Sequence, residues 1–232
     1  MSEILKCTGL TKKYGSLVAL DNLDLSVNKG QIIGLLGPNG SGKTTFIKLI
    51  AGLLKQNSGE LLVGGEKIGI NTKKIVSYLP ERTYIPGWMR VIDIIRMFED
   101  FYEDFNLEKA KTMLDNLGIK FNQRIKSMSK GTKEKLQLIL VMSREAQLYL
   151  LDEPIAGVDP AARDYILRTI ITNYNPEAAV IISTHLIQDI ETVLDDVIMI
   201  QNGHLKIHKT VDEIREESGQ SVDELFREVF RC

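Results

Sequence analysis

The sequence has few of the residues that build disulfide frameworks or metal clusters. Its two cysteines, Cys7 and Cys232, lie near opposite ends of the 232-residue chain and form no C-x-x-C pair. The three histidines are not clustered. Paired or clustered cysteines are the usual sign of a disulfide scaffold or a zinc site. We therefore expect two isolated, reduced thiols.

Long apolar runs and strongly basic stretches are also missing. No run approaches the ~18–20 apolar residues that a membrane-spanning helix needs. The net charge of −2, without a basic run, argues against a nucleic-acid partner. Residues 1–6 lack the architecture of a signal peptide. We therefore expect a cytoplasmic protein that reaches a membrane only through a partner.

The composition and patterning that are present indicate an α/β protein. Hydrophobic residues make up 44% of the chain, enough for a sizeable core. Short strands are predicted at residues 17–20, 23–27, 60–63 and 75–79, with a tight turn at Gly64-Gly65. Apolar runs at 147–152 and 179–183 are typical of buried parallel strands. Asn202-Gly203 between two apolar runs predicts a hairpin.

A helical pattern interrupts this α/β pattern. Apolar residues recur at three- and four-residue steps in a stripe that predicts a helix with a buried face, made of Val91, Ile94, Ile95, Phe98, Phe101, Tyr102 and Phe105. The alternative is that the outer end of this stripe contacts a partner. We predict an α/β core over 1–90 and 145–210, a helical segment over 91–144, and a helical tail over 211–232 with Val222, Leu225, Phe226 and Val229 on one face.

One segment fits the phosphate-loop pattern G-x-x-x-x-G-K-[ST] without a mismatch, and it lies between a predicted strand and a predicted helix. Its residues are Gly37, Pro38, Asn39, Gly40, Ser41, Gly42, Lys43, Thr44 and Thr45. Glycines let backbone N–H groups turn toward a phosphate chain, and a helix N-terminus favours negative charge. Lys43 can reach the β- and γ-phosphates, and the Thr44 hydroxyl can bind Mg²⁺. The alternative is a glycine-rich turn without a ligand.

Two carboxylates end the apolar run Leu148-Tyr149-Leu150-Leu151. A buried strand would deliver Asp152 to the sheet edge where open α/β folds bind ligands. Asp152 is suited to hold Mg²⁺, directly or through water, and Glu153 to act as the general base toward the attacking water. The alternative is a strand end with two solvated acids.

The order of further motifs makes the chain resemble the nucleotide-binding ATPase subunit of ABC transporters across nearly its whole length. These motifs contain Tyr14, Glu81, Ser129 with Gly131, Asp159 and His185. The resemblance implies a P-loop core, an antiparallel β subdomain and a helical insert. It also implies ATP hydrolysis with Mg²⁺.

The resemblance assigns each of these residues a role. Tyr14 matches the residue that stacks on adenine, and Glu81 falls at the glutamine-loop position, where it would bind Mg²⁺. His185 matches the histidine that bonds the γ-phosphate. From the residues alone, Tyr14 also fits an ordinary strand-end tyrosine, and His185 also fits a helix cap.

The remaining matches imply a second ATPase subunit. In the family two subunits face head to tail, so Ser129, Gly131 and Asp159 would contact the ATP of the partner. The sequence leaves open whether that partner is a second copy or a different ATPase.

Two departures from the family pattern stand out. Lys130 occupies a glycine position of the signature Leu-Ser-Gly-Gly-Gln, and Thr132 replaces its glutamine. Lys130 either adds positive charge near the phosphates or points to solvent. Glu81 replaces the usual glutamine, which removes an amide donor and adds charge. Both departures resemble exporter-type bacterial ABC ATPases and favour export over uptake.

The resemblance also implies integral membrane permease subunits as partners. The cleft beside residues 81–89 would receive a cytoplasmic helix of such a subunit, which would place the chain on the inner face of the membrane. Trp88 and Met89 are either an exposed apolar anchor there or packed within the insert.

Two other classes of function compete with this interpretation. A soluble ABC-type ATPase of translation or DNA maintenance would usually carry two motif sets or a long coiled coil, and neither is found in the sequence. A P-loop kinase or ligase would explain Lys43 and Asp152 but not Ser129, Asp159 and His185. The transported substrate is not encoded in this chain, because permease subunits determine it.

Overall fold

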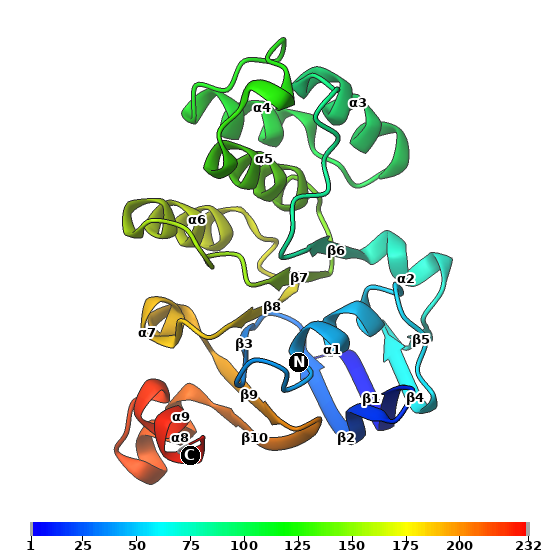
Figure 1. Cartoon of the computed structure of the whole chain (residues 1–232), viewed down its shortest axis with the longest axis vertical. Coiled ribbons are helices and arrows are strands. Elements are labelled where there is room, and N and C mark those ends of the chain that lie inside the picture. Colours follow the sequence, from blue (N-terminus) through cyan, green and yellow to red (C-terminus); the bar gives the residue numbers. More distant parts are fainter. Residues whose placement is uncertain (1, 231–232) are drawn as a thin grey trace.

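The computed structural model describes residues 2–230, and at residues 160–162 the backbone alone. Its strands form two sheets that occupy the lower part of Figure 1, and helices α3 to α5 lie at the top of that view. The predicted α/β fold is confirmed. Cys7 is a buried free thiol, whereas Cys232 lies outside the described residues.

The larger sheet has the strand order β10-β9-β3-β8-β7-β6. Its strands are β3 (Ile32–Leu36), β6 (Val76–Leu79), β7 (Leu148–Asp152), β8 (Ala179–Thr184), β9 (Asp196–Gln201) and β10 (His204–Thr210). All neighbouring pairs run parallel except β9 and β10. Strands β3, β7 and β8 are buried along their whole length, as their unbroken apolar runs predict. Because these strands are parallel, the segments that follow them meet at one edge of the sheet.

The smaller sheet is antiparallel, with the order β2-β1-β4-β5. Its strands are β1 (Glu3–Tyr14), β2 (Leu17–Asn28), β4 (Ser58–Val63) and β5 (Glu66–Lys67). The two separate strands predicted at 17–20 and 23–27 are in fact one strand, β2. Asn22 between them has a positive φ of 49°, which bends the strand without ending it.

Helix α1 (Lys43–Ile50) follows the phosphate loop, and α2 (Ile70–Ile75) precedes β6. The strand predicted at 75–79 is present as β6, one residue shorter, because Ile75 ends α2, a helix that the sequence did not predict. The Thr72 hydroxyl closes the first turn of this helix by bonding both the N–H and the carbonyl oxygen of Gly69, at 3.0 and 3.1 Å. Helices α6 (Pro160–Asn173) and α7 (Ile187–Ile190) follow β7 and β8 in the chain.

The helical insert contains α3 (Val91–Phe101), α4 (Leu107–Asn116), a 3₁₀ turn (Ile125–Ser127) and α5 (Lys130–Met142). Most of the predicted stripe is buried, but Phe101 is 76% exposed, so its assignment to the core was wrong. The chain turns after α3, and Tyr102 and Phe105 pack back onto Phe98, with ring centroids 5.4 and 5.7 Å away. Phe101 is therefore left on the outside of the turn.

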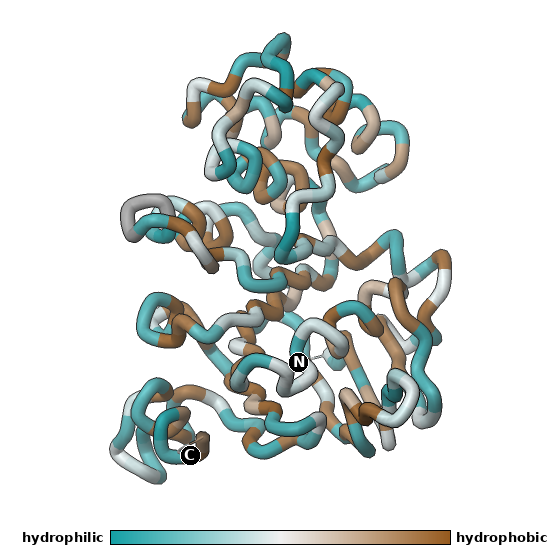
Figure 2. The backbone as a smooth tube through the Cα atoms, in the orientation of Figure 1, coloured by the Kyte–Doolittle hydropathy of each residue, from teal (hydrophilic) through white to brown (hydrophobic). Residues whose placement is uncertain are grey.

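Two apolar clusters form the core, and the larger sheet separates them. Along β3, Ile32 and Leu36 belong to one cluster and Ile33 and Leu35 to the other. This alternation follows the two-residue period of a strand. In Figure 2 the hydrophobic colour accordingly concentrates along the central strands, while the hydrophilic colour marks the outer turns.

The predicted hairpin and tail are both present. Asn202 and Gly203 connect β9 to β10 with φ values of 51° and 81°, as an Asn-Gly hairpin turn requires. The tail forms α8 (Val211–Ser218) and α9 (Val222–Val229), and α9 packs its predicted apolar face against the core. A 3₁₀ turn (Glu191–Val193) supplies the Glu191 carboxylate that accepts the N–H of Val222 at 3.0 Å. Within residues 2–230, none of the helices combines the length and apolar character needed to cross a membrane.

Candidate functional site

The phosphate loop connects β3 to α1 at the carboxyl edge of the large sheet. Two of its glycines are required by close backbone contacts. A Cβ on Gly37 would lie 2.3 Å from the carbonyl oxygen of Ile200, and a Cβ on Gly42 would lie 2.5 Å from that of Ala19. Both also have positive φ values, which L side chains rarely adopt. The hairpin turn supports the loop from outside, because the N–H of Gly203 donates to the carbonyl oxygen of Ser41 at 2.9 Å.

Lys43 lies inside this loop and is only 6% exposed. Its ammonium donates to the carbonyl oxygens of Gly37, at 2.7 Å, and Pro38, at 3.3 Å. Burial lowers the pKa of Lys43, while the charges of Glu153 and Asp152 oppose that shift. The loop therefore holds a desolvated cation next to two carboxylates, in a place suited to a phosphate chain.

Asp152 ends β7 with a buried carboxylate. Its Oδ1 accepts hydrogen bonds from the hydroxyls of Ser183, at 2.7 Å, and Thr44, at 3.1 Å. Its Oδ2 is buried without a hydrogen-bond partner. Burial raises the pKa of this carboxyl, whereas the Ser183 and Thr44 hydroxyls oppose the rise.

The unpartnered oxygen of Asp152 and the nearby Thr44 hydroxyl are the kind of oxygen ligands that bind Mg²⁺. Mg²⁺ prefers oxygen ligands and is usually held by one or two side chains together with substrate phosphates and waters. Within the part of the chain that the structure describes, no group of three or more His, Cys, Asp or Glu side chains could hold a metal by itself. Thr44 and Asp152 therefore fit a Mg²⁺ ion that arrives with a nucleotide.

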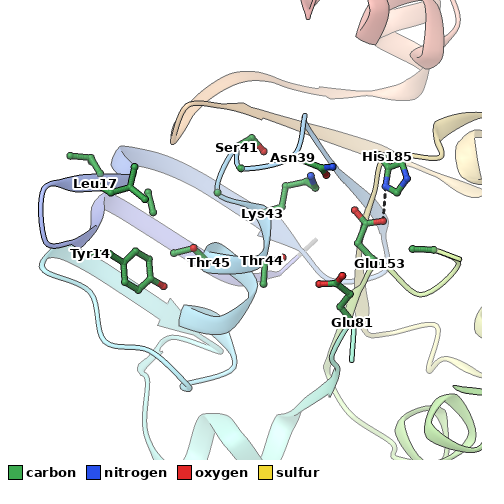
Figure 3. Close-up of a pocket in the computed structure, with 15 residues that line it drawn as sticks. Tyr14, Leu17, Asn39, Ser41, Lys43, Thr44, Thr45, Glu81, Glu153 and His185 are labelled. Atoms are coloured by element: carbon green, nitrogen blue, oxygen red, sulfur yellow. Dashed lines mark hydrogen bonds and ion pairs between the residues drawn. The ribbon is translucent and has the colours of Figure 1, made fainter. Parts of the chain in front are cut away.

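Glu153 and His185 contact each other across the carboxyl ends of β7 and β8. The Nδ1 of His185 lies 3.0 Å from Oε2 of Glu153, and this contact is the dashed line in Figure 3. A carboxylate is only an acceptor, so Nδ1 carries the donated proton and Nε2 stays available to a substrate. Thr184 rather than His185 bonds the N–H of Leu186 at the start of α7, which disfavours the helix-cap interpretation of His185.

The backbone at Glu153 is strained. Its φ is 51°, a value uncommon for a residue with a side chain, and its N–H is fixed by the hydroxyl of Ser183 at 3.0 Å. Such conformations cluster at active sites because the surrounding structure must hold them. Ser183 was not among the predicted site residues, although it ends the β-branched run that predicted β8.

A cavity of about 390 Å³ brings most of the predicted residues together. In Figure 3, Tyr14 and Leu17 lie at one end, the phosphate loop in the middle, and Glu81, Glu153 and His185 at the other end. Tyr14 is 45% exposed, and the side chain of Leu17 is exposed beside it. Four further lining residues were not predicted from the sequence: Leu17, Val18, Ala19 and Ala156. The exposed apolar side chains of Leu17 and Val18 on an antiparallel strand were the only signal.

The residues predicted to contact the partner's ATP lie elsewhere. Ser129, Gly131 and Asp159 are not among the residues that line this cavity. Ser129 is the N-cap of α5, where its hydroxyl accepts the N–H of Thr132 at 3.2 Å. The Lys130 side chain is 79% exposed and lies 3.7 Å from Glu134, so within one chain it points to solvent. The carbonyl oxygen of Asp159 accepts the N–H of Arg163 at the start of α6.

A second cavity, of about 570 Å³, lies between the large sheet and the helical insert. We call it the groove; its lining is mainly apolar and aromatic and includes two lysines: Lys48, Ala51, Leu53, Lys73, Val76, Tyr78, Pro80, Tyr84, Met97, Phe98, Phe101 and Tyr102. Neither residue of the predicted anchor lines it. Met89 is buried in the insert, whereas Trp88 is 79% exposed.

The fold and the site together define a P-loop ATPase with a helical insert. A family model described as "ABC transporter" matches residues 20–156. The chain is 34% identical over 216 residues to the ABC transporter ATP-binding protein YdbJ of Bacillus subtilis, covering 88% of this chain and 68% of that relative. It is 28% identical over 222 residues to the SkfA peptide export ATP-binding protein SkfE of Bacillus subtilis, covering 93% of each.

A solved structure gives the same result. It is described as an ATP-binding subunit of an ABC transporter, and it superposes with a TM-score of 0.88 at 25% identity, covering 98% of this chain and 100% of that one. This chain belongs to the ABC transporter family as an ATP-binding subunit.

Proposed function

We propose that this subunit hydrolyses Mg²⁺-bound ATP in a head-to-tail dimer and drives export through separate permease subunits. The observation that carries the proposal is the Glu153–His185 contact of 3.0 Å at the edge of a cavity lined by the phosphate loop. Tyr14 would stack on the adenine at the opposite end. Lys43 and the loop amides would bind the phosphates.

The hydrolytic step follows from this arrangement. The oxygen of a water attacks the γ-phosphorus while Glu153 takes a proton from that water. The bond from the γ-phosphorus to the β–γ bridging oxygen breaks, leaving ADP and phosphate. His185 orients the Glu153 carboxylate through Nδ1 and offers Nε2 to the γ-phosphate. A Mg²⁺ ion held by Thr44 and Asp152, with Glu81 near them, would neutralise charge on the phosphate oxygens.

The position of three predicted ATP contacts supports the proposal of a dimer. Ser129, Gly131 and Asp159 lie outside the cavity of their own chain. A second ATPase subunit, turned head to tail, would bring its Ser129 and the N-terminus of α5 to the γ-phosphate. In that arrangement Lys130, exposed in the single chain, would also face the partner.

The groove is the proposed docking site for a cytoplasmic helix of a permease. Its aromatic lining fits the apolar face of an amphipathic helix, and Lys48 and Lys73 favour an acidic residue on that helix. This docking would hold the subunit on the inner face of the membrane. A tagged chain with Phe101→Asp should lose co-purifying permease subunits, whereas Trp88→Ala should retain them because Trp88 lies outside the groove.

Export is supported by a relative and by two residues of the chain itself. SkfE is described as a peptide export subunit and aligns with 93% of this chain. The glutamate at position 81 and the lysine at position 130 favour the same direction.

Glu153→Gln tests the central proposal. The amide cannot accept the proton of the water, so turnover should fall at least a hundredfold, while ATP binding persists and an ATP-dependent dimer accumulates. Glu108→Gln, on the surface of α4, is the matched control and should behave like the wild type. Unchanged turnover in Glu153→Gln, or no gain of dimer with ATP, would refute the mechanism.

A further inference from the structure

A buried arginine joins three parts of the chain where the helical insert meets the core. Arg144 lies two residues after the end of α5, and its side chain is only 3% exposed. Its Nε and Nη2 donate to the two carboxylate oxygens of Asp104, each at 2.9 Å. Asp104 belongs to the connection between α3 and α4. This bidentate geometry fixes the guanidinium plane against the insert.

The same guanidinium also bonds the core. Nη1 donates to the carbonyl oxygen of Val76 and Nη2 to that of Lys74, both at 2.5 Å. Val76 is the first residue of β6, and Lys74 lies in α2. Arg144 therefore connects the end of α5, the α3–α4 connection and the start of β6. We call these contacts the Arg144 joint.

Backbone bonds make the joint rigid. The N–H of Asn106 donates to the carbonyl oxygen of Ser143 at 2.7 Å, and that of Glu145 to the carbonyl oxygen of Asp104 at 2.9 Å. The hydroxyl of Tyr149, in β7, donates to the carbonyl oxygen of Arg144 at 2.5 Å. The residue is thus held through both its main chain and its side chain.

The joint contacts a residue that lines the groove. The guanidinium carbon of Arg144 lies 3.9 Å from the centre of the Tyr102 ring, a cation–π contact. Both Tyr102 and Val76 line the groove. A helix docked there would press on a tyrosine that rests on the joint.

The other end of α5 carries the signature residue Ser129. Figure 1 shows α5 between the remaining insert helices and strand β7. With about 1.5 Å per residue, its 13 residues span about 20 Å, so a tilt of about 5° at the joint moves Ser129 by about 2 Å. Displacements of this size strongly reduce catalysis where reacting groups must be aligned.

We propose that Arg144 is a positioning residue that sets the angle of α5, behind the Tyr102 ring of the groove, and so places Ser129 for the partner's ATP. The inference rests on the proposed function, in which Ser129 serves a second subunit. The added element is the contact between Tyr102 and Arg144, through which a helix bound in the groove would affect the composite site. Arg144 touches neither ATP nor the reacting atoms.

Arg144→Lys tests the joint, because a single ammonium keeps the charge but cannot make the bidentate and stacked contacts. We expect kcat to fall at least tenfold and ATP-driven dimerisation to weaken, with the KM and Kd for ATP changing less than twofold. Tyr102→Leu, which removes only the stacked ring, is the milder second variant and should lower kcat about threefold or more. Lys109→Gln is the control, because the partly buried Lys109–Glu145 ion pair at 3.2 Å lies beside the joint without belonging to it.

The outcomes separate the possibilities. If Arg144→Lys and Tyr102→Leu keep wild-type kcat below their melting temperatures, the joint has only a structural role and the inference is wrong. The same holds if kcat and ATP affinity fall together. If Arg144→Lys does not fold, Tyr102→Leu decides. Ser129→Ala is measured in parallel, because normal turnover in that variant would instead refute the composite site of the proposed function.

Discussion

At the scale of single residues, Asp152 keeps a carboxylate where burial opposes its charge. Its pKa is raised chiefly by burial, and one of its oxygens has no partner. Proteins tolerate such groups where function needs them, at a cost in stability. The raised pKa means that the folded state binds the proton more tightly than the unfolded state does. Stability is therefore lost as the pH rises from the usual carboxyl pKa of 3.8 through the folded value.

Asp152→Asn should remove this cost together with the activity. Without nucleotide, we expect the variant to be more stable than the wild type at pH 7 by on the order of 1 kcal/mol, with the gain vanishing below the usual Asp pKa. Mg²⁺-dependent turnover should be lost. Denaturant unfolding between pH 3.5 and 7 checks the stability, and a variant less stable than the wild type across that range would contradict the prediction.

Tyr14 offers an exposed ring next to Leu17, at the far end of the cavity from Glu153. Tyr14→Ala should weaken ATP binding by about 1 kcal/mol, roughly fivefold, since a stacked aromatic pair contributes about that much. Tyr14→Phe should bind normally. Inorganic tripolyphosphate, which has no base, should bind all three proteins alike by calorimetry; a loss there would show that Tyr14 acts on the phosphate loop instead.

At the scale of elements, Ser129 has two roles in α5. Its hydroxyl caps the helix now, and the proposed dimer uses it for the partner's ATP. Ser129→Ala should lower the free energy of unfolding by about 1 kcal/mol, a typical loss for an N-cap. Ser221 caps α9 in the same way, so Ser221→Ala is the matched control. Thermal melts should show similar losses for both, whereas turnover should fall only in Ser129→Ala. Equal turnover in the two variants would speak against a role beyond capping.

Elements with long, unambiguous patterns were predictable from the sequence. The unbroken apolar runs predicted β7 and β8, and Asn202-Gly203 predicted the hairpin. Short or bent elements were not predictable. Helix α2 depends on Thr72 bonding Gly69, and β2 continues through a residue with positive φ. Phe101 fits a helical stripe, but only the turn after α3 decides that it faces outward.

Some residues of the candidate site were likewise predictable from local sequence patterns, and others were not. The phosphate loop, Asp152 and Glu153 follow from local patterns, because a strand fixes where the next residues emerge. The Ser183–Asp152 bond and the Arg144–Asp104 pair join residues 31 and 40 positions apart, and no local pattern reports such pairings. The same applies to Leu17, which lines the cavity only because the smaller sheet folds against the phosphate loop.

At the scale of the whole molecule, each chain supplies half of the proposed composite site. Gly131 has open space where a side chain would project, so Gly131→Asp should fold normally but repel the partner's phosphates. Lys43→Ala should disrupt phosphate binding in the other half of the site, the phosphate loop. Each variant alone should be inactive as a homodimer.

Mixing the two variants in equal amounts should restore activity. Half of the dimers would be mixed, and each mixed dimer would contain one intact site of two, so about a quarter of wild-type turnover is expected if the two sites act independently. The mixture is compared with each variant alone in a steady-state ATPase assay. No recovery above the sum of the separate activities would contradict a head-to-tail arrangement of two copies of this chain.

The bond from Gly203 to the phosphate loop joins two segments that the ribosome makes at different times. Strand β3 lies between β8 and β9, and the turn that bonds Ser41 comes about 160 positions after the loop itself. At about 5–20 residues per second, a ribosome needs roughly 8–30 s between making the loop and making its support. The loop is thus synthesised before β8, β9 and the hairpin turn, and the bond to Gly203 can form only after them. The final shape of the phosphate loop therefore depends on segments that lie far after it in the chain.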